Sequence, residues 1–213
     1  MQDARARPLS RLAAEPSAII DAVLGNDRRV LLVGQPGIGK STLVNAVAEV
    51  LGRAGRACWC IGADPGSPLF GVPGAVCLGR WDGERWALAG VEALCTLDAG
   101  RFRLPLVSAV ARLAQQLPSE VVLVDGPGVV RGIAGAELLP GITQAARIEV
   151  VLALAREGRP APLAQELSAL PIEAVAVQAA SGARRPGKRI RARERTGLWD
   201  AYLADASRKK RHV

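Results

Sequence analysis

Nine consecutive residues carry the strongest signal in this sequence: Gly34-Gln35-Pro36-Gly37-Ile38-Gly39-Lys40-Ser41-Thr42. They match the pattern G-x-x-x-x-G-K-[ST] of a phosphate-binding loop, or P-loop. The three glycines let the backbone curl so that several N–H groups point at one anion. Lys40 is expected to neutralise the β- and γ-phosphates of a nucleoside triphosphate, and the Ser41 hydroxyl to bind Mg²⁺.

The segments around this loop give it the expected structural context. Residues 28–33 are predicted to form a buried strand before the loop, and residues 41–51 a helix after it. Further apolar strands are expected at 57–63, 120–124, 149–155 and 172–177, and helices at 13–24, 103–117 and 137–146, with a long loop from residue 65. Alternating strands and helices predict an α/β fold: a P-loop NTPase with a mostly parallel sheet and helices on both faces.

The composition of the 213 residues is that of a globular protein with an aliphatic core. Apolar residues make up 49%, charged residues 23% and aromatic residues only 3%, which excludes a disordered chain. We expect a single P-loop domain over residues 1–213, with a basic lid or tail at about 181–213.

No feature of the sequence points to a membrane or to secretion. No apolar run approaches the roughly 18 residues that cross a bilayer, and no secretory signal is apparent. Cys58, Cys60, Cys77 and Cys95 lack the spacing of a zinc site, so they are expected to be buried, reduced thiols. These observations predict a cytoplasmic protein with no membrane partner.

Basic residues are concentrated at the C-terminal end. Residues 181–213 contain eleven basic and three acidic side chains, which accounts for the whole net charge of +8. A basic helix is predicted at 189–206. Such asymmetry indicates either a polyanionic partner or a solvated tail.

Two aspartates, Asp64 and Asp125, follow predicted strands. Ligands of open α/β sheets bind at the carboxyl ends of strands, so both can face the triphosphate. One would hold Mg²⁺, and either could take the proton from an attacking hydroxyl. The alternative is that one of them caps a turn, because Asp-Pro-Gly and Asp-Gly are common turn sequences.

The run Asp125-Gly126-Pro127-Gly128 also fits the D-x-x-G pattern of GTPases. However, the sequence contains no later Asn-Lys-x-Asp for reading guanine. This counts against a GTPase switch.

Three blocks together resemble the polynucleotide 5′-hydroxyl kinases, a family that includes the kinase subunit of the pre-mRNA cleavage and polyadenylation factor and the nucleolar pre-rRNA-processing kinase. The blocks are GQPGIGKST (34–42), ADPGSPLFGVPGAVCLG (63–79) and LVDGPGVVRGIAGAELL (123–139). Their order and spacing agree over about residues 28–155. The resemblance implies an ATP- and Mg²⁺-dependent enzyme that transfers the γ-phosphate to the 5′-hydroxyl end of RNA or DNA, single-stranded or end-exposed.

The resemblance also implies catalytic roles for individual residues. Asp64 matches the family's catalytic Asp, which serves Mg²⁺ and activates the 5′-hydroxyl. Arg191 and Arg195 are the best matches to the arginines of the family's lid, although Arg189 or Arg193 could replace either. Lys40 and Ser41 keep their P-loop roles.

The nucleic-acid contacts depart from the family pattern. Arg131 stands where the family has a Lys in its clasp region, and Ser67 where it has a Gln. Val129 replaces the clasp Trp that stacks on a substrate base. Two alternatives remain open: Trp81 or Trp86 takes over this stacking, or both are ordinary packing residues.

Two other classes of protein remain compatible with the sequence. One is a P-loop ATPase or GTPase acting as a regulator. The other is a degenerate kinase fold that binds nucleotide and nucleic acid as a scaffold with weak or no catalysis.

Overall fold

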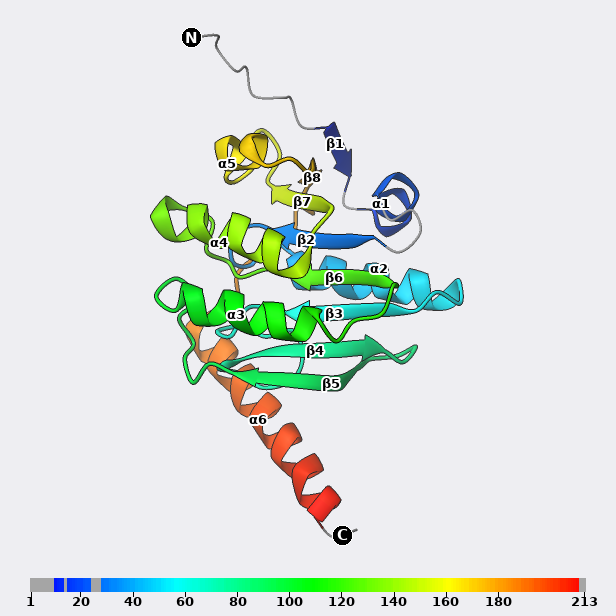
Figure 1. Ribbon diagram of the computed structural model, residues 1–213, viewed down its shortest axis with the longest axis vertical. Coiled ribbons are helices and arrows are strands. Elements are labelled where there is room, and N and C mark those ends of the chain that lie inside the picture. The colour runs from blue at the N-terminus through cyan, green and yellow to red at the C-terminus, as the bar shows by residue number, and fades with distance from the viewer. Residues whose placement is uncertain (1–9, 14, 24–27, 211–213) are drawn as a thin grey trace.

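The computed structural model describes residues 10–13, 15–23 and 28–210, in which an eight-stranded sheet runs through the molecule (Figure 1). The strand order is β1-β8-β7-β2-β6-β3-β4-β5. Their bounds are β1 (Ser10–Ala13), β2 (Arg29–Val33), β3 (Cys58–Gly62), β4 (Ala75–Trp81), β5 (Trp86–Ala93), β6 (Val121–Asp125), β7 (Val150–Ala155) and β8 (Glu173–Gln178). The pairs β3–β4 and β4–β5 are antiparallel, and the other five are parallel.

Helices cover both faces of this sheet. On one face lie α1 (Pro16–Val23) and α2 (Lys40–Arg53), and on the other α3 (Arg103–Ala114), α4 (Gly132–Ala146) and α5 (Ala164–Ala169). The last helix, α6 (Lys188–Lys210), extends away from the sheet toward the C-terminus (Figure 1). The predicted P-loop α/β fold, with its mostly parallel sheet and its C-terminal helix, is confirmed.

The sheet separates two apolar clusters. Leu32 of β2 belongs to the cluster under α1 and α2, whereas its neighbour Leu31 belongs to the cluster under α3, α4 and α5. Successive side chains of a strand point to opposite faces, so a strand covered on both sides must be apolar throughout. This is why β2, β6 and β7 consist of Val, Leu and Ala, apart from Arg29 at the start of β2 and Asp125 at the end of β6.

The register of the sheet brings the carboxyl ends of three strands together beside the P-loop. Asp125, the last residue of β6, pairs with Leu32 of β2 on one side and with Gly62 of β3 on the other. The carboxyl ends of β2, β6 and β3 are therefore level. The P-loop, Asp125 and the segment after β3 meet at one edge of the sheet.

Several elements differ from the sequence prediction. The chain after residue 65 is a loop only as far as residue 74, and β4 and β5 then form an antiparallel hairpin. At the tip of this hairpin, Asp82 Oδ1 accepts hydrogen bonds from the N–H groups of Glu84 and Arg85, and Gly83 has a φ of 110°. Strand β1 and helix α5 were not expected, and α4 begins five residues earlier than predicted.

The cysteines are free, but not all are buried. Cys58, Cys60 and Cys77 are buried, and burial raises the pKa of the Cys58 thiol to about 12. The prediction is wrong for Cys95, which is exposed in the loop that follows β5 and has a φ of 55°.

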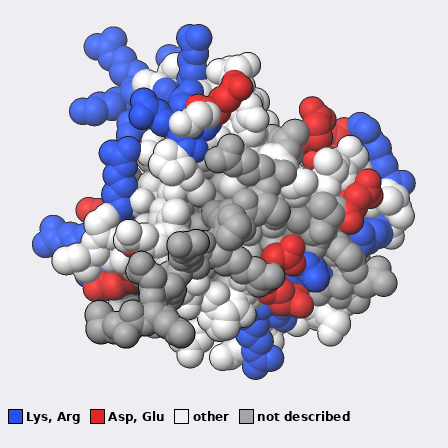
Figure 2. All heavy atoms as spheres, turned by 90° about the horizontal axis from the view of Figure 1, so that it is seen from above, with Lys and Arg blue, Asp and Glu red and all other residues white. Residues whose placement is uncertain are grey.

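The structure also shows where the basic side chains lie and how apolar the helices are. Seen from the β1 end of the molecule, Lys and Arg side chains gather at one margin, at the upper left of Figure 2. Among the described residues, no helix combines the length and the apolar character needed to cross a membrane.

Candidate active site

The P-loop connects β2 to α2 and has the conformation that its glycines predict. Gly37 and Gly39 have φ angles of 76° and 102°, which side-chain-bearing residues rarely adopt. Lys40 is only 6% exposed, and its Nζ donates a hydrogen bond of 3.1 Å to the carbonyl oxygen of Gly34. The lysine is thus folded back across the loop, with its charge held where phosphates would bind.

Asp125 lies directly beside the loop. Its Oδ2 accepts a 2.6 Å hydrogen bond from the Ser41 hydroxyl, while its Oδ1 is buried and has no hydrogen-bond partner among the described groups. Burial raises the pKa of Asp125 to about 6, although Lys40 and the Ser41 hydroxyl lower it. A buried carboxylate oxygen without a partner, next to a serine hydroxyl, fits a Mg²⁺ ion, which prefers oxygen ligands.

Asp64 follows β3 and both of its predicted roles are compatible with its position. Its Oδ1 accepts hydrogen bonds from the N–H groups of Gly66 (3.0 Å) and Ser67 (3.1 Å), so it caps the turn there. Its Oδ2 has no hydrogen-bond donor within the described part of the chain, and the residue lines the same cavity as Asp125. One oxygen fixes the side chain, and the other remains available for chemistry.

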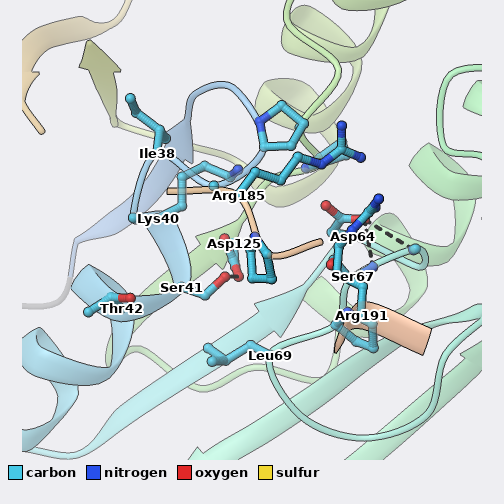
Figure 3. A pocket seen from close by; sticks show the side chains of 18 of the residues that line it. Ile38, Lys40, Ser41, Thr42, Asp64, Ser67, Leu69, Asp125, Arg185 and Arg191 are labelled. Carbon is cyan, nitrogen blue, oxygen red and sulfur yellow. Dashed lines mark hydrogen bonds between the residues drawn. The ribbon is translucent and has the colours of Figure 1, made fainter. Parts of the chain in front are cut away.

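These residues line a cavity of about 1440 Å³ at the carboxyl edge of the sheet (Figure 3). Seven P-loop residues, Pro36 to Thr42, form one wall; Gly34 is buried behind them and Gln35 is exposed. Pockets for one small molecule usually measure roughly 300–1,000 Å³. The cavity therefore has room for a nucleotide together with part of a second substrate.

Helix α6 contributes arginines to the opposite wall. Arg191 and Arg195 are partly buried and line the cavity, whereas Arg189 and Arg193 are exposed and do not. An Nη atom of Arg195 donates a 3.2 Å hydrogen bond to the carbonyl oxygen of Gly66. The Nε of Arg191 is buried without a partner among the described groups. Of the four arginines considered from the sequence, the structure brings Arg191 and Arg195 to the site.

Of the residues expected to contact nucleic acid, some line the cavity and others do not. Ser67 and Val129 line the cavity. Arg131 is exposed at the start of α4, outside the lining. Trp81 packs edge-on against Trp86 at 5.1 Å between ring centres, inside the molecule's own aromatic cluster. For Trp81 the structure thus shows the packing position that the sequence left as the alternative.

Sequence reasoning missed part of the lining. Asp98, Arg185 and Glu194 line the cavity but were not selected from the sequence. In the sequence, Arg185 is one of eleven basic residues of the C-terminal region, and no motif singles it out. Its position could have indicated its role, because it follows the last predicted strand, and segments that follow parallel strands lie at the ligand-binding edge of the sheet.

Two family models match parts of the chain. One is described as the mRNA cleavage and polyadenylation factor CLP1 P-loop and matches residues 102–205. The other is described as the methylmalonyl Co-A mutase-associated GTPase MeaB and matches residues 8–83. No curated protein matches the sequence at a significant level.

Solved structures give the clearest comparison. A wild-type Clp1p–Pcf11p complex superimposes with a TM-score of 0.67 and 16% identity, covering 83% of this chain and 49% of that chain. A second structure is titled for the extended interface between Pcf11p and Clp1p and for ATP loss in a point mutant. It superimposes with a TM-score of 0.64 and 16% identity, covering 84% of this chain and 49% of that chain. The fold is that of the Clp1 P-loop core.

Together with the CLP1 P-loop model, this match confirms the resemblance to the polynucleotide 5′-hydroxyl kinases that the three sequence blocks indicated. The chain spans about half the length of the Clp1p chains that it matches. At 16% identity the likeness establishes the fold, and the activity has to be argued from the site.

Proposed function

We propose that this protein is an ATP-dependent polynucleotide 5′-hydroxyl kinase that transfers the γ-phosphate to the 5′-hydroxyl end of RNA or DNA. The observation that carries the proposal is the position of Arg191 and Arg195, which face the same cavity as Lys40 and the two aspartates. Phosphoryl transfer is catalysed mainly by positioning and by stabilising charge on the transferring group. A site with cations on two opposite walls suits that task.

The residues divide into a donor side and an acceptor side. On the donor side the P-loop binds the triphosphate, and Ser41 and Asp125 would hold Mg²⁺, with Asp64 nearby. The ion, when bound, neutralises charge on the phosphates. On the acceptor side, the free Oδ2 of Asp64 accepts the proton from the 5′-hydroxyl as it attacks.

The acceptor is proposed to be a polynucleotide because of charge and space. The cavity exceeds the usual size for one small molecule, and the basic C-terminal region supplies cations that can release counterions from a phosphate backbone. Ser67 would lie nearest the 5′ end of the nucleic acid. The exposed Arg131 would contact the nucleic acid outside the cavity. Trp81 is left out of this proposal because it is packed against Trp86.

The test is label transfer from γ-labelled ATP, with Mg²⁺, to a panel of RNA and DNA oligonucleotides ending in a 5′-hydroxyl. The matched control is the same set carrying a 5′-phosphate, which offers no acceptor. Transfer to the first set alone is expected. Absence of transfer to every 5′-hydroxyl oligonucleotide would contradict the proposal.

A second candidate is a nucleotide-hydrolysing regulator. It is favoured by the match of residues 8–83 to the MeaB GTPase model and by the D-x-x-G pattern at Asp125. Hydrolysis of GTP in preference to ATP, at a rate unchanged by oligonucleotide, would support this candidate. Tight oligonucleotide binding without either reaction would instead indicate a scaffold.

A further inference from the structure

The segment that follows β8 crosses the P-loop. We call residues 179–186 the strap. Its start continues the sheet, because Ala179 N donates a 2.8 Å hydrogen bond to Ala155 O. Farther along, Ala183 N donates to Ala180 O at 3.0 Å, and an Nη of Arg156 donates to Ala183 O at 3.1 Å. The strap is therefore held in place by β7 and by the residue that follows β7.

The strap backbone lies directly on the P-loop. A Cβ atom at Gly37 would lie 2.3 Å from the Cα and 2.4 Å from the N of Arg185. These distances are far below van der Waals contact, so no side chain fits between the two segments. Gly37 is thus required twice: for its φ of 76° and for the approach of Arg185.

The Arg185 side chain enters the cavity. It is one of the lining residues, and Figure 3 shows it reaching over the loop toward Asp64. It forms no ion pair with any carboxylate in the described ranges. A guanidinium that the fold places over a phosphate loop, with no acidic partner, is available for an anion.

We propose that Arg185 binds the γ-phosphate of the nucleotide; this rests on triphosphate binding at the P-loop, part of the proposed function. The backbone of a P-loop surrounds the β- and γ-phosphates of the nucleotide, and Gly37 belongs to that backbone. Arginine can offer two parallel N–H groups to phosphate oxygens. Arg185 acts from the strap on the donor, whereas Arg191 and Arg195 act from α6.

The inference predicts selectivity between nucleotides. Since only the triphosphate has a γ-phosphate, Arg185→Ala is expected to weaken ATP binding roughly 10- to 100-fold, the range for losing a hydrogen bond to a charged group. ADP binding should change by less than about threefold. Arg185→Lys keeps the charge but loses the planar fork, so its loss should be intermediate and again selective for ATP.

The experiment is equilibrium binding of ATP and ADP to the full chain with Mg²⁺, by displacement of a fluorescent nucleotide analogue. Arg189→Ala is the matched control, because it removes the same charge from a residue outside the cavity lining. Equal loss for ATP and ADP, or no loss, would overturn the inference. If Arg185→Ala does not fold, Arg185→Lys decides by the same criterion.

The outcome can be separated from that of the proposed function. If the wild-type chain binds neither nucleotide, the proposed function fails at its first step and Arg185 loses its role with it. If nucleotide binding shows the predicted selectivity while no oligonucleotide is phosphorylated, the kinase proposal fails and the Arg185 assignment stands.

Discussion

Lys40 is the residue on which the proposed phosphate binding depends most directly. It is buried, it follows the last glycine of the loop, and its Nζ already bonds to the loop carbonyl of Gly34. Lys40→Ala is expected to abolish phosphoryl transfer, because no other P-loop residue supplies a cation. The measurement is label transfer, with a thermal melt to show that the variant is folded. Near-wild-type transfer by a folded variant would remove the basis of the kinase proposal.

Asp64 and Asp125 are expected to differ when each is replaced by Asn. The amide oxygen of Asn can still accept the hydrogen bonds that Asp64 and Asp125 receive. Any fall in the single-turnover rate is therefore due to the loss of the negative charge. Asp64→Asn should lower the single-turnover rate by roughly 10³-fold or more, since a proton acceptor and an ion contact are lost together. Asp125→Asn should lower it less if Asp125 supports the ion only through water. The opposite ranking would make Asp125 the base.

The raised pKa of Asp125 predicts a pH-dependent stability. Its ordinary value is 3.8 and burial raises it to about 6, so the unfolded state ionises at lower pH than the folded state. Asp125 therefore contributes stability that is complete below about pH 4 and is lost as pH rises through about 6. Without nucleotide or Mg²⁺, the free energy of unfolding of the wild type should fall relative to that of Asp125→Asn over this range.

This prediction is checked by urea unfolding of both proteins at intervals from pH 4.5 to 7.5. Added Mg²⁺ and ATP should reduce the fall, because a bound cation favours the ionised carboxylate. A difference between the two proteins that stays constant with pH would contradict the prediction.

At the residue scale, the sequence predicted the P-loop side of the cavity lining better than the rest of the lining. Lys40, Ser41 and Asp125 follow from rules that link a motif or a strand end to its neighbours in space. Trp81 could not be placed this way, because stacking and packing use the same aromatic side chain. Only the ring contact with Trp86 distinguishes them.

At the scale of the element, α6 is expected to be a catalytic helix whose arginines differ in role. Arg191 and Arg195 lie four residues apart, so a helix presents them on one face, and that face lines the cavity. Replacing either by Ala should lower kcat strongly, by roughly 10³-fold for an arginine that stabilises the transferring group. The oligonucleotide Kd should change little. Arg193→Ala, from the exposed face, is the matched control.

The end of α6 should behave in the opposite way. Truncation after Ala206 removes four basic residues, of which Arg211 lies outside the described residues. Each lost phosphate contact weakens binding and reduces its salt dependence. The oligonucleotide Kd is expected to rise, more at low salt than at high salt, while kcat is retained. If Arg191→Ala and Arg195→Ala change only Kd, α6 is not a catalytic lid.

Elements with a regular apolar pattern were predicted, and those without one were not. The strand–loop–helix unit from β2 to α2 follows from an apolar run, a motif and a helical repeat. The sequence does not predict the hairpin β4–β5, because Pro and Gly residues precede it and Gly79 and Gly90 interrupt its strands. A strand pair formed around internal glycines is stabilised by its partners in the sheet, which a local pattern does not reveal.

At the scale of the whole molecule, the strap explains why the cavity could not be completed from the sequence. Its contact joins Gly37 to Arg185, far apart along the chain, and depends on β8 lying parallel to β2 with only β7 between them. Strand order sets this distance, and strand order is not encoded in any local motif. The concentration of basic residues near the C-terminus, in contrast, can be counted directly in the sequence, and Figure 2 shows the largest group of Lys and Arg side chains at one margin.

Helix α6 lies outside the apolar core, and this leads to a prediction about the stability of the molecule. Among the described residues, none from α6 belongs to either apolar cluster, and of its described side chains only Arg191, Arg195 and Leu198 are partly buried. Stability from apolar burial is roughly proportional to the area removed from water. Truncation after Pro186 keeps the strap and both clusters, so it should shift Tm by less than about 4 °C.

The matched comparison is Leu32→Ala, which removes a side chain that is 1% exposed in the cluster under α2. That variant should cost about 2–5 kcal/mol and lower Tm by roughly 5–20 °C. The truncated chain should still bind ATP, because Lys40, Ser41 and Arg185 are retained, yet transfer no phosphate to an oligonucleotide, because Arg191 and Arg195 are gone. A fall in Tm as large as that of Leu32→Ala would show that α6 is part of the stable core, and retained transfer would show that catalysis does not need it.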